Sequence, residues 1–257
     1  MKPAKIRAIY RYPVKGLSAE RLATAALVTG ATVAGDRRYA IENGPSGFDP
    51  QAPAWLPKQR FLMLMKNERL ARLTTRYHDA TRTLVILHDG REAVRGDLGT
   101  EQGRAAIERF FATFCADELR GPPKVLQAKG HSFSDVARKV VSIINLASVI
   151  AIETMASARV DPLRFRANLY LEGWPAFTEF DLVGCEIAIG EGARLKIIKR
   201  IPRCAAVNVE PDTGRRDLDI PQTLMRALGH ADCGVYAEVI APGAVATGDR
   251  VTVMVGA

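Results

Sequence analysis

The chain has 257 residues with 47% hydrophobic and 25% charged side chains, the composition of a soluble globular protein with one large domain or two small ones. It has no apolar run long enough to cross a bilayer and no apolar signal-peptide core, so we expect a cytoplasmic protein without a membrane partner. Its net charge of +8 comes without a zinc finger, a lysine-rich tail or an RNA-binding aromatic signature, which favours an anionic small molecule over nucleic acid.

The first hundred residues favour short strands. Strands are predicted at residues 5–12, 22–29, 37–42, 60–66 and 71–79. Residues 43–60 are rich in glycine and proline and predict a long loop, which in a compact domain is often functional. Residues 83–98 predict a hairpin that turns at Asp89–Gly90.

Helical patterns begin near residue 100. Residues 100–119 place Ile107, Phe110, Phe111 and Phe114 on one helical face, and Thr100 is a candidate N-cap. Further helices are predicted at 146–157, after Asn145 as N-cap, and at 221–228, after Asp219 as N-cap. The other segments of this half predict strands, at residues 167–173, 185–190, 194–200, 205–210, 234–240 and 249–255.

The order of these elements indicates the fold class. Many short strands, few helices and no alternation of strand and helix exclude a Rossmann or TIM architecture. We expect a β-rich α+β fold in which β-barrels carry a few peripheral helices. The glycine and two prolines at 121–123 end the first helix, so we place the boundary between two domains there, at 1–122 and 123–257.

Two segments near the N-terminus carry candidate ligand-binding cations. In YPVKG, Pro13 ends a strand and Gly16 frees the backbone, which leaves Lys15 on a tight turn. In GDRRYAI, Arg37 and Arg38 open a predicted strand, so at most one of them can face a common pocket. An ordinary exposed lysine and solvated arginines are the plainer interpretation of both segments.

The segment RFRANLYLEG places Arg166 and Asn168 two residues apart on a predicted strand. Residues two apart on a strand share a face. An arginine and an amide on one face suit a planar, hydrogen-bonding anionic ligand. A surface arginine beside a turn-forming asparagine is the alternative.

Cys204 lies in IPRCAAVNVEPDTG, between a basic run and a predicted turn. The four cysteines are too widely spaced for a zinc ribbon or an iron–sulfur cluster, and we expect free thiols. Nearby cations favour the thiolate form of a cysteine, which is a nucleophile and a ligand for soft or high-valent metals. A buried, inert cysteine is the alternative.

The segment after residue 228 also holds His230 and Cys233, either of which could be catalytic. The strand that follows them runs toward a final strand opened by Gly248–Asp249. We therefore interpret this segment as a hairpin that closes a barrel, with His230 and Cys233 in a loop.

Five segments in this order resemble the MOSC superfamily, whose domains are related to the C-terminal part of molybdenum cofactor sulfurase. They are YPVKG, GDRRYAI, FRAN, PRCAAVNVEPDTG, and GVYAEV followed by GDRVTV. The order and spacing are most similar to two-part proteins that include the mitochondrial amidoxime reducing component and its bacterial relatives. The resemblance runs nearly end to end.

This resemblance implies a β-rich N-terminal domain and a MOSC β-barrel that hold a molybdopterin-type molybdenum cofactor between them. It implies that Cys204 ligates molybdenum and takes part in catalysis. It also implies that Lys15, Arg37, Arg166 and Asn168 bind the pterin and its phosphate. At the level of the whole family it further implies pyridoxal phosphate binding.

The leading functional hypothesis is a molybdenum-cofactor oxidoreductase that reduces N-hydroxylated or N-oxide compounds. The alternatives are a cofactor carrier without turnover, sulfur transfer through a Cys204 persulfide, and a basic nucleic-acid-associated protein. The sequence has no GxGxxG after a strand and no clustered cysteines. We therefore expect electrons from a separate redox protein, and the basic charge favours an acidic one.

Overall fold

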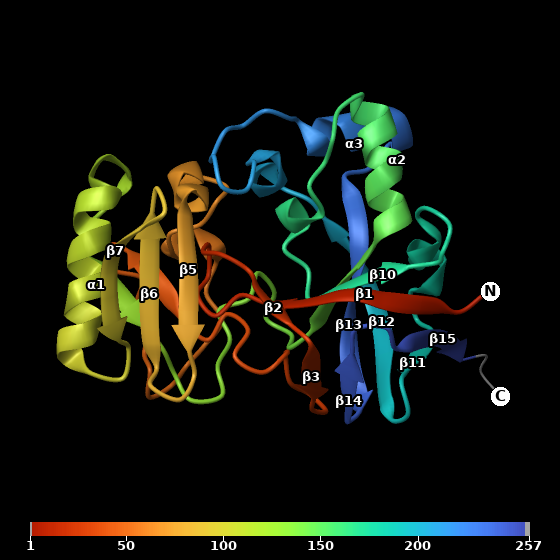
Figure 1. The fold of residues 1–257 in the computed structure, drawn as a ribbon, viewed down its shortest axis with the longest axis horizontal. Helices are drawn as coiled ribbons and strands as arrows, with labels where there is room; N and C mark the ends of the chain where they lie inside the picture. The colour runs from red at the N-terminus through yellow and green to blue at the C-terminus, as the bar shows by residue number, and fades with distance from the viewer. Residues whose placement is uncertain (1, 255–257) are drawn as a thin grey trace.

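The computed structural model describes residues 2–254 and confirms a β-rich α+β fold (Figure 1). Its strands are β1 Ala4–Arg11, β2 Glu20–Leu22, β3 Thr24–Leu27, β4 Ala40–Asn43, β5 Leu73–His78, β6 Thr83–His88, β7 Arg91–Asp97, β8 Pro123–Leu126, β9 Val141–Asn145, β10 Leu169–Glu172, β11 Glu186–Ile189, β12 Ala193–Pro202, β13 Asp232–Ala241, β14 Gly243–Ala246 and β15 Arg250–Met254. The α-helices are α1 Glu101–Phe114, α2 Leu146–Ala156 and α3 Ile220–Leu228. Single 3-10 turns are η1 Lys58–Arg60, η2 Glu68–Arg72, η3 Ala116–Glu118, η4 Pro162–Phe165, η5 Thr178–Leu182 and η6 Ala205–Asn208.

Seven strands close into a barrel. Their order is β10, β9, β13, β12, β11, β15 and β1, and pairing of β1 with β10 completes the ring. The β9–β10 pair is parallel and the other pairs of the ring are antiparallel. The first strand of the chain is therefore part of the same barrel as the strands of the C-terminal half. The boundary at 122/123 stays a prediction.

Alternation of side chains fills the barrel. In β12, Leu195 and Ile197 are buried while Arg194 and Lys196 are exposed. Successive side chains of a strand point to opposite faces, so this pattern directs aliphatic residues inward and charged ones to solvent. The interior is a continuous cluster of mainly aliphatic side chains from the barrel strands, which also includes Trp174 and Phe180.

A second layer of structure stands beside the barrel and comes from the N-terminal half (Figure 1). Strands β5, β6 and β7 form an antiparallel sheet that shares a core with α1, and β4 pairs with β8. The expected turn at Asp89–Gly90 is confirmed, since both residues have positive φ, 50° and 75°. A Cβ on Gly96 of β7 would collide with the carbonyl of Gly103 in α1, so these glycines allow the helix to lie close to the sheet.

The three predicted helices and their caps are confirmed. Thr100, Asn145 and Asp219 each accept a hydrogen bond from a backbone N–H in the first turn of their helix. Helices α2 and α3 pack together at one end of the barrel over a core that includes Ile152 and Leu224. Within residues 2–254, no helix is long and apolar enough to span a membrane.

Two predicted strands are wrong. Residues 60–66 contribute only an isolated bridge at Phe61, and most of the segment forms turns. Residues 205–210 begin as the 3-10 turn η6 instead of a strand. Both are short apolar runs whose pattern fits the buried side of a turn as well as a strand. The predicted last strand extended to Val255, which lies outside the described residues.

Candidate functional site

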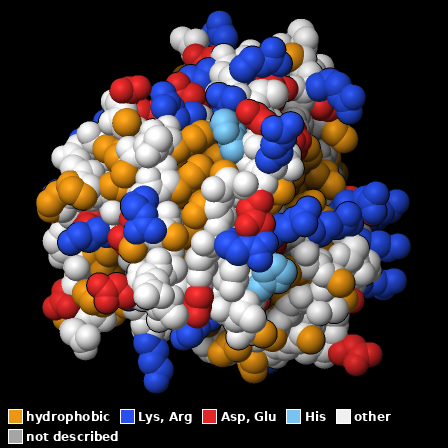
Figure 2. Space-filling model, turned by 60° about the vertical axis from the view of Figure 1, so that its left-hand side comes forward, with side chains coloured by type: hydrophobic (Ala, Val, Ile, Leu, Met, Phe, Trp, Pro, Cys, Tyr) orange, Lys and Arg blue, Asp and Glu red, His pale blue; other side chains and the backbone are white. Residues whose placement is uncertain are grey.

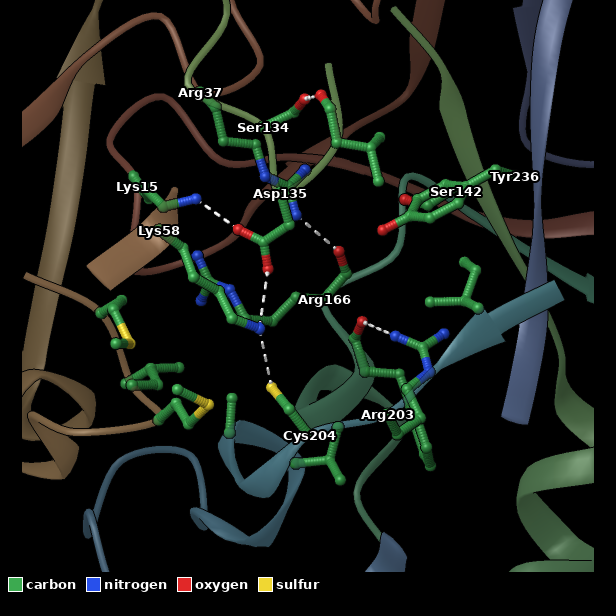
Figure 3. A pocket seen from close by; sticks show the side chains of 18 of the residues that line it. Lys15, Arg37, Lys58, Ser134, Asp135, Ser142, Arg166, Arg203, Cys204 and Tyr236 are labelled. Carbon is green, nitrogen blue, oxygen red and sulfur yellow. Dashed lines mark hydrogen bonds and ion pairs between the residues drawn. The ribbon is translucent and has the colours of Figure 1, made fainter. Parts of the chain in front are cut away.

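A cavity of about 260 Å³ lies between the barrel and the N-terminal layer. It brings together the five residues to which the resemblance assigns a role, namely Lys15, Arg37, Arg166, Asn168 and Cys204. They come from the loop after β1, the loop before β4, the segment between η4 and β10, and the end of β12. Figure 3 shows Lys15, Arg37, Arg166 and Cys204 around this space.

Lys15 reaches the cavity from the tight turn that the sequence predicts. Its backbone N–H donates to the Tyr39 carbonyl at 2.8 Å, and Gly16 has a φ of +83°. A Cβ at Gly16 would lie 3.0 Å from the Leu62 carbonyl oxygen, so a side chain there would be strained and crowded. The Lys15 Nζ atom donates to the Phe133 carbonyl at 2.9 Å and forms an ion pair with Asp135.

Arg37 also lines the cavity, but the expected reason is wrong. It precedes β4 and has a φ of 47°, so it belongs to a turn and not to the start of a strand. Its Nη1 donates to Asp36 at 2.5 Å and its Nη2 to the Arg166 carbonyl at 2.9 Å. Burial opposes the charge of Arg37, but the Asp36 carboxylate dominates and raises its pKa. Arg38 lies over the Tyr39 ring and is not among the residues that line the cavity.

Arg166 is the least satisfied cation of the cavity. It ends η4 with a φ of 51°, so the predicted strand position is wrong. Its Nη2 is buried and has no hydrogen-bond partner among residues 2–254. Burial, together with the charge of Arg37, lowers the pKa of Arg166 to about 10, although Tyr12 opposes this shift. A buried guanidinium N–H without a partner lowers the free energy of unfolding, and an anionic ligand would supply the missing hydrogen-bond acceptor.

Asn168 lies just before β10, and its side chain is bound mainly to the protein. Its Oδ1 accepts from the Ser142 backbone N–H at 3.1 Å and from the Ser142 hydroxyl at 2.9 Å. Its Nδ2 donates to the Tyr10 carbonyl at 3.2 Å. The shared strand face expected for Arg166 and Asn168 does not exist. Asn168 instead ties β9 and β1 together at the wall of the cavity.

Tyr12 holds the two arginines. The guanidinium of Arg37 lies 4.5 Å from the ring centroid of Tyr12, and that of Arg166 lies 4.3 Å from it. Tyr12 is 1% exposed, so both cation–π contacts are shielded from water. No local pattern indicates this role of Tyr12, because the arginines lie 25 and 154 residues further along the chain.

Tyr12→Phe should keep anion binding, whereas Tyr12→Leu should weaken it about tenfold, because leucine removes two cation–π contacts of roughly 0.5–2 kcal/mol each. Phenylalanine keeps the ring on which both guanidinium groups lie. Titration calorimetry with inorganic phosphate measures both variants. Equal weakening in Tyr12→Phe and Tyr12→Leu would contradict a role for the ring.

Cys204 lies two residues after the end of β12, at the N-cap position of η6. The cation beside it is Lys58, whose Nζ donates to the Cys204 Sγ at 3.2 Å. Of the basic run before Cys204, Lys199 and Arg203 line the same cavity, although Arg203 donates to the carbonyls of Cys233 and Phe165, and the guanidinium of Arg200 lies over the Phe180 ring. The expected positive setting of the thiol is therefore present, and Lys58 of the long loop 43–60 supplies the cation that contacts the sulfur.

Lys58 and Asp135 are site residues that sequence reasoning missed. The Asp135 carboxylate pairs with Lys15 and lies 3.8 Å from the Lys58 Nζ, so Lys15, Asp135, Lys58 and Cys204 form a continuous chain of contacts (Figure 3). Although burial opposes it, the charges of Lys15 and Lys58 lower the pKa of Asp135. Neither residue sits in a motif that would have drawn attention to it.

Asp135→Asn is expected to lower the melting temperature of the unliganded protein by at least about 2 °C, because it removes the countercharge of the buried Lys15. The same change should enlarge the stabilisation that inorganic phosphate produces, since a competing carboxylate is lost. Thermal unfolding with and without phosphate tests both effects. A smaller phosphate effect in Asp135→Asn than in the unmodified protein would contradict this account of the cavity.

The other candidates lie away from the cavity. Cys233 is fully buried, and burial raises its pKa to about 12. The Nδ1 of His230 accepts from the Asp232 backbone N–H at 3.1 Å. His230 precedes β13, as expected for a loop residue, but Cys233 lies inside β13, so its predicted loop position is wrong. The predicted hairpin is wrong as well, because β13 pairs with β12 and β9 while β15 pairs with β11 and β1. All four cysteines are free.

The cavity as a whole is strongly positive. Seven basic and two acidic side chains line it, an excess of five positive charges. Residues 2–254 contain no cluster of three or more His, Cys, Asp or Glu side chains that could hold a metal ion. Cys204 is therefore a single soft donor in a basic cavity. Such a site suits an anionic ligand that brings most of the ligands of its own metal.

Comparisons with known proteins match both halves of the chain. A family model described as MOSC N-terminal beta barrel domain matches residues 3–118, and one described as MOSC domain matches residues 128–252. A search of curated proteins finds no match.

Solved structures show more distant similarity. The YUAD protein from Bacillus subtilis is 16% identical with a TM-score of 0.48, and the alignment covers 98% of this chain and 96% of that one. YiiM from Geobacillus stearothermophilus is 17% identical with a TM-score of 0.36, covering 45% of this chain and 54% of that one. YiiM from Escherichia coli is 23% identical with a TM-score of 0.34, covering 46% and 55%.

Proposed function

The chain belongs to the MOSC superfamily, whose domains are associated with molybdenum cofactor binding, and from this we infer that its basic cavity holds a molybdopterin-type molybdenum cofactor. The observation that carries the proposal is the presence of Cys204 and the unpartnered Arg166 Nη2 in one cavity. A thiolate is a fitting ligand for molybdenum, and an unsatisfied guanidinium N–H fits a phosphate.

The residues present fit this cofactor. Cys204 would ligate the metal through Sγ, while Lys15, Arg37 and Arg166 would bind the phosphate and the polar edge of the pterin. Asn168 would act mainly as a support, because its Oδ1 and Nδ2 are already engaged by Ser142 and Tyr10. When bound, the cofactor supplies two-electron redox chemistry that none of these side chains can perform.

We propose further that the protein is an oxidoreductase that reduces N-hydroxylated or N-oxide compounds. Reduction of an N–OH group to N–H consumes two electrons and two protons and releases water. Hydrophobic side chains, among them Met63, Met65 and Val207, line the same cavity as Cys204 and offer contacts to the hydrocarbon part of a substrate. Turnover of a hydroxylated amidine by the molybdenum-loaded protein tests this activity; molybdenum without turnover would favour the carrier.

The electrons would come from a separate protein, which is expected to be acidic. The chain carries a net charge of +8, and Lys and Arg side chains are spread widely over the face in Figure 2, with fewer Asp and Glu side chains among them. Complementary charge speeds the encounter of two proteins and is screened by salt.

The loaded protein should therefore turn over with an artificial one-electron dye and not with NADPH alone. Turnover that depends on a partner protein should fall as ionic strength rises. An anaerobic assay with dye, with NADPH, and with NADPH plus a candidate partner measures all three cases. Efficient turnover with NADPH and no added protein would show that the chain holds a hydride-accepting site of its own.

A further inference from the structure

A second cavity of about 200 Å³ lies beside the basic one. We call it the apolar cavity, because aliphatic side chains form most of its wall: Leu17, Leu64, Leu70, Leu73, Leu163 and Val209. They come from the loop after β1, from the turn before η2, from η2 and β5, from η4 and from the segment after η6. The apolar cavity thus lies where the N-terminal layer meets the barrel half.

The size of the apolar cavity limits what it can hold. An apolar cavity of roughly 150 Å³ takes up benzene. A volume of about 200 Å³ therefore accommodates one aromatic ring or a short branched alkyl group with a small polar head. Leu17 and Leu70 are 2% and 1% exposed, so the wall is part of the packed core. Its side chains cannot move outward to enlarge the cavity without disturbing their neighbours. A fused two-ring group should not fit.

The two cavities share a wall. Gly16, Leu64, Arg164 and Arg166 line both of them. The side chain of Arg164 is 2% exposed, and its Nη atoms donate to the Asn208 carbonyl at 3.0 Å and to Asp217 at 2.8 Å. Its Nε has no hydrogen-bond partner within residues 2–254, and the same holds for Nη2 of Arg166. Two unsatisfied donors thus belong to the residues that separate the cavities.

We propose that the apolar cavity binds the hydrocarbon group of the substrate, while an oxygen of the substrate accepts a hydrogen bond from Arg164 Nε at the shared wall. This proposal rests on the proposed reductase function and specifies the size of the substrates of the reductase: neutral N-hydroxylated compounds that carry one ring or a short branched chain. Asp212 also lines the apolar cavity, and together with Asp217, which pairs with Arg164, it offsets the charges of Arg164 and Arg166, so the wall favours a neutral group.

The arrangement accounts for two features at once. The side chains that line an empty apolar cavity lack van der Waals contacts on one side, and a bound hydrocarbon group would supply them. An unpartnered, buried N–H loses a hydrogen bond that a neutral oxygen would restore. Arg164 is fixed by Asp217, and both arginines line both cavities, so the shared wall holds two unpartnered donors for the two ligands.

The test uses 4-fluorobenzamide, a neutral one-ring compound with an acceptor oxygen, and follows its binding to the purified protein by fluorine NMR. Ala71→Phe places a ring in the apolar cavity, which Ala71 lines, and should weaken binding at least about tenfold. Ala112→Phe, on the exposed side of α1, is the matched control and should leave binding unchanged. Leu163→Ala should enlarge the cavity and admit 6-fluoro-2-naphthamide, which the unmodified protein should reject.

Absence of binding to the unmodified protein, or undiminished binding in Ala71→Phe, would overturn the proposal. If Ala71→Phe fails to fold, the binding of 6-fluoro-2-naphthamide to Leu163→Ala tests the proposal instead. Failure of Leu163→Ala to bind this compound would contradict the assignment of the apolar cavity as the binding site. Molybdenum content, measured on the same preparations, reports separately on the proposed function, because binding of the probe requires no turnover.

Discussion

Cys204→Ser is expected to abolish the retention of molybdenum, whereas Cys115→Ser and Cys185→Ser should retain it. A serine hydroxyl is a hard, protonated group at neutral pH and cannot replace a soft thiolate as a metal ligand. Cys204 lines the basic cavity and accepts from Lys58, while Cys115 belongs to the core around α1 and Cys185 packs against the barrel core.

Metal analysis by mass spectrometry, on protein made in a host that synthesises the cofactor, measures the three variants together. Burial raises the pKa of Cys115 to about 12, so this thiol is inert and serves as the control. The melting temperature of each variant shows whether a loss of metal reflects a loss of fold. Equal loss of molybdenum in all three variants would defeat the assignment of Cys204.

Arg166→Ala is expected to weaken cofactor binding by about tenfold or more, and Arg38→Ala should have little effect. A hydrogen bond from a charged group contributes roughly 1.5–3 kcal/mol, which corresponds to that loss. Arg166 lines the cavity with an unpartnered Nη2, whereas Arg38 lies over Tyr39 outside the lining. If Arg38→Ala proves the more damaging change, the assignment of the phosphate site is wrong.

The stability of the unliganded protein gives an independent readout of Arg166. Its pKa is lowered to about 10, so the folded state holds this proton less tightly than the unfolded chain does. At neutral pH the charge therefore destabilises the fold, and stability is regained only as the pH rises through 10. Arg166→Met should weaken cofactor binding without lowering the melting temperature. A clear loss of stability would mark Arg166 as structural instead.

Patterns among neighbouring residues predict most of the helices, strands and turns of the fold correctly. The turn at Asp89–Gly90 and the caps at Thr100, Asn145 and Asp219 depend on neighbouring residues only, and the sequence predicts them correctly. The strands at 60–66 and 205–210 were wrong because a short apolar run packs equally well on a turn. The closure of the barrel by β1 and β10 joins distant segments, so no local pattern could show it.

The site was predicted in part and for partly wrong reasons. The basic cavity does gather all five predicted residues, but Arg37 and Arg166 reach it from positive-φ positions and not from strand faces. Lys58 contacts Cys204 across 146 residues of sequence, and Asp135 contacts Lys15 across 120. Contacts of this range depend on the tertiary fold, and neither Lys58 nor Asp135 carries a local signal of its role.

The most direct test of the central claim is the molybdenum and pterin content of the unmodified protein. The protein is purified from a host that makes the cofactor; the metal is measured by mass spectrometry, and the pterin by fluorescence after oxidative release. A site with one thiol ligand and one phosphate-binding cluster predicts about one molybdenum and one pterin per chain in fully loaded protein. Protein that contains neither, from a host in which a known molybdenum enzyme is loaded, would contradict the account.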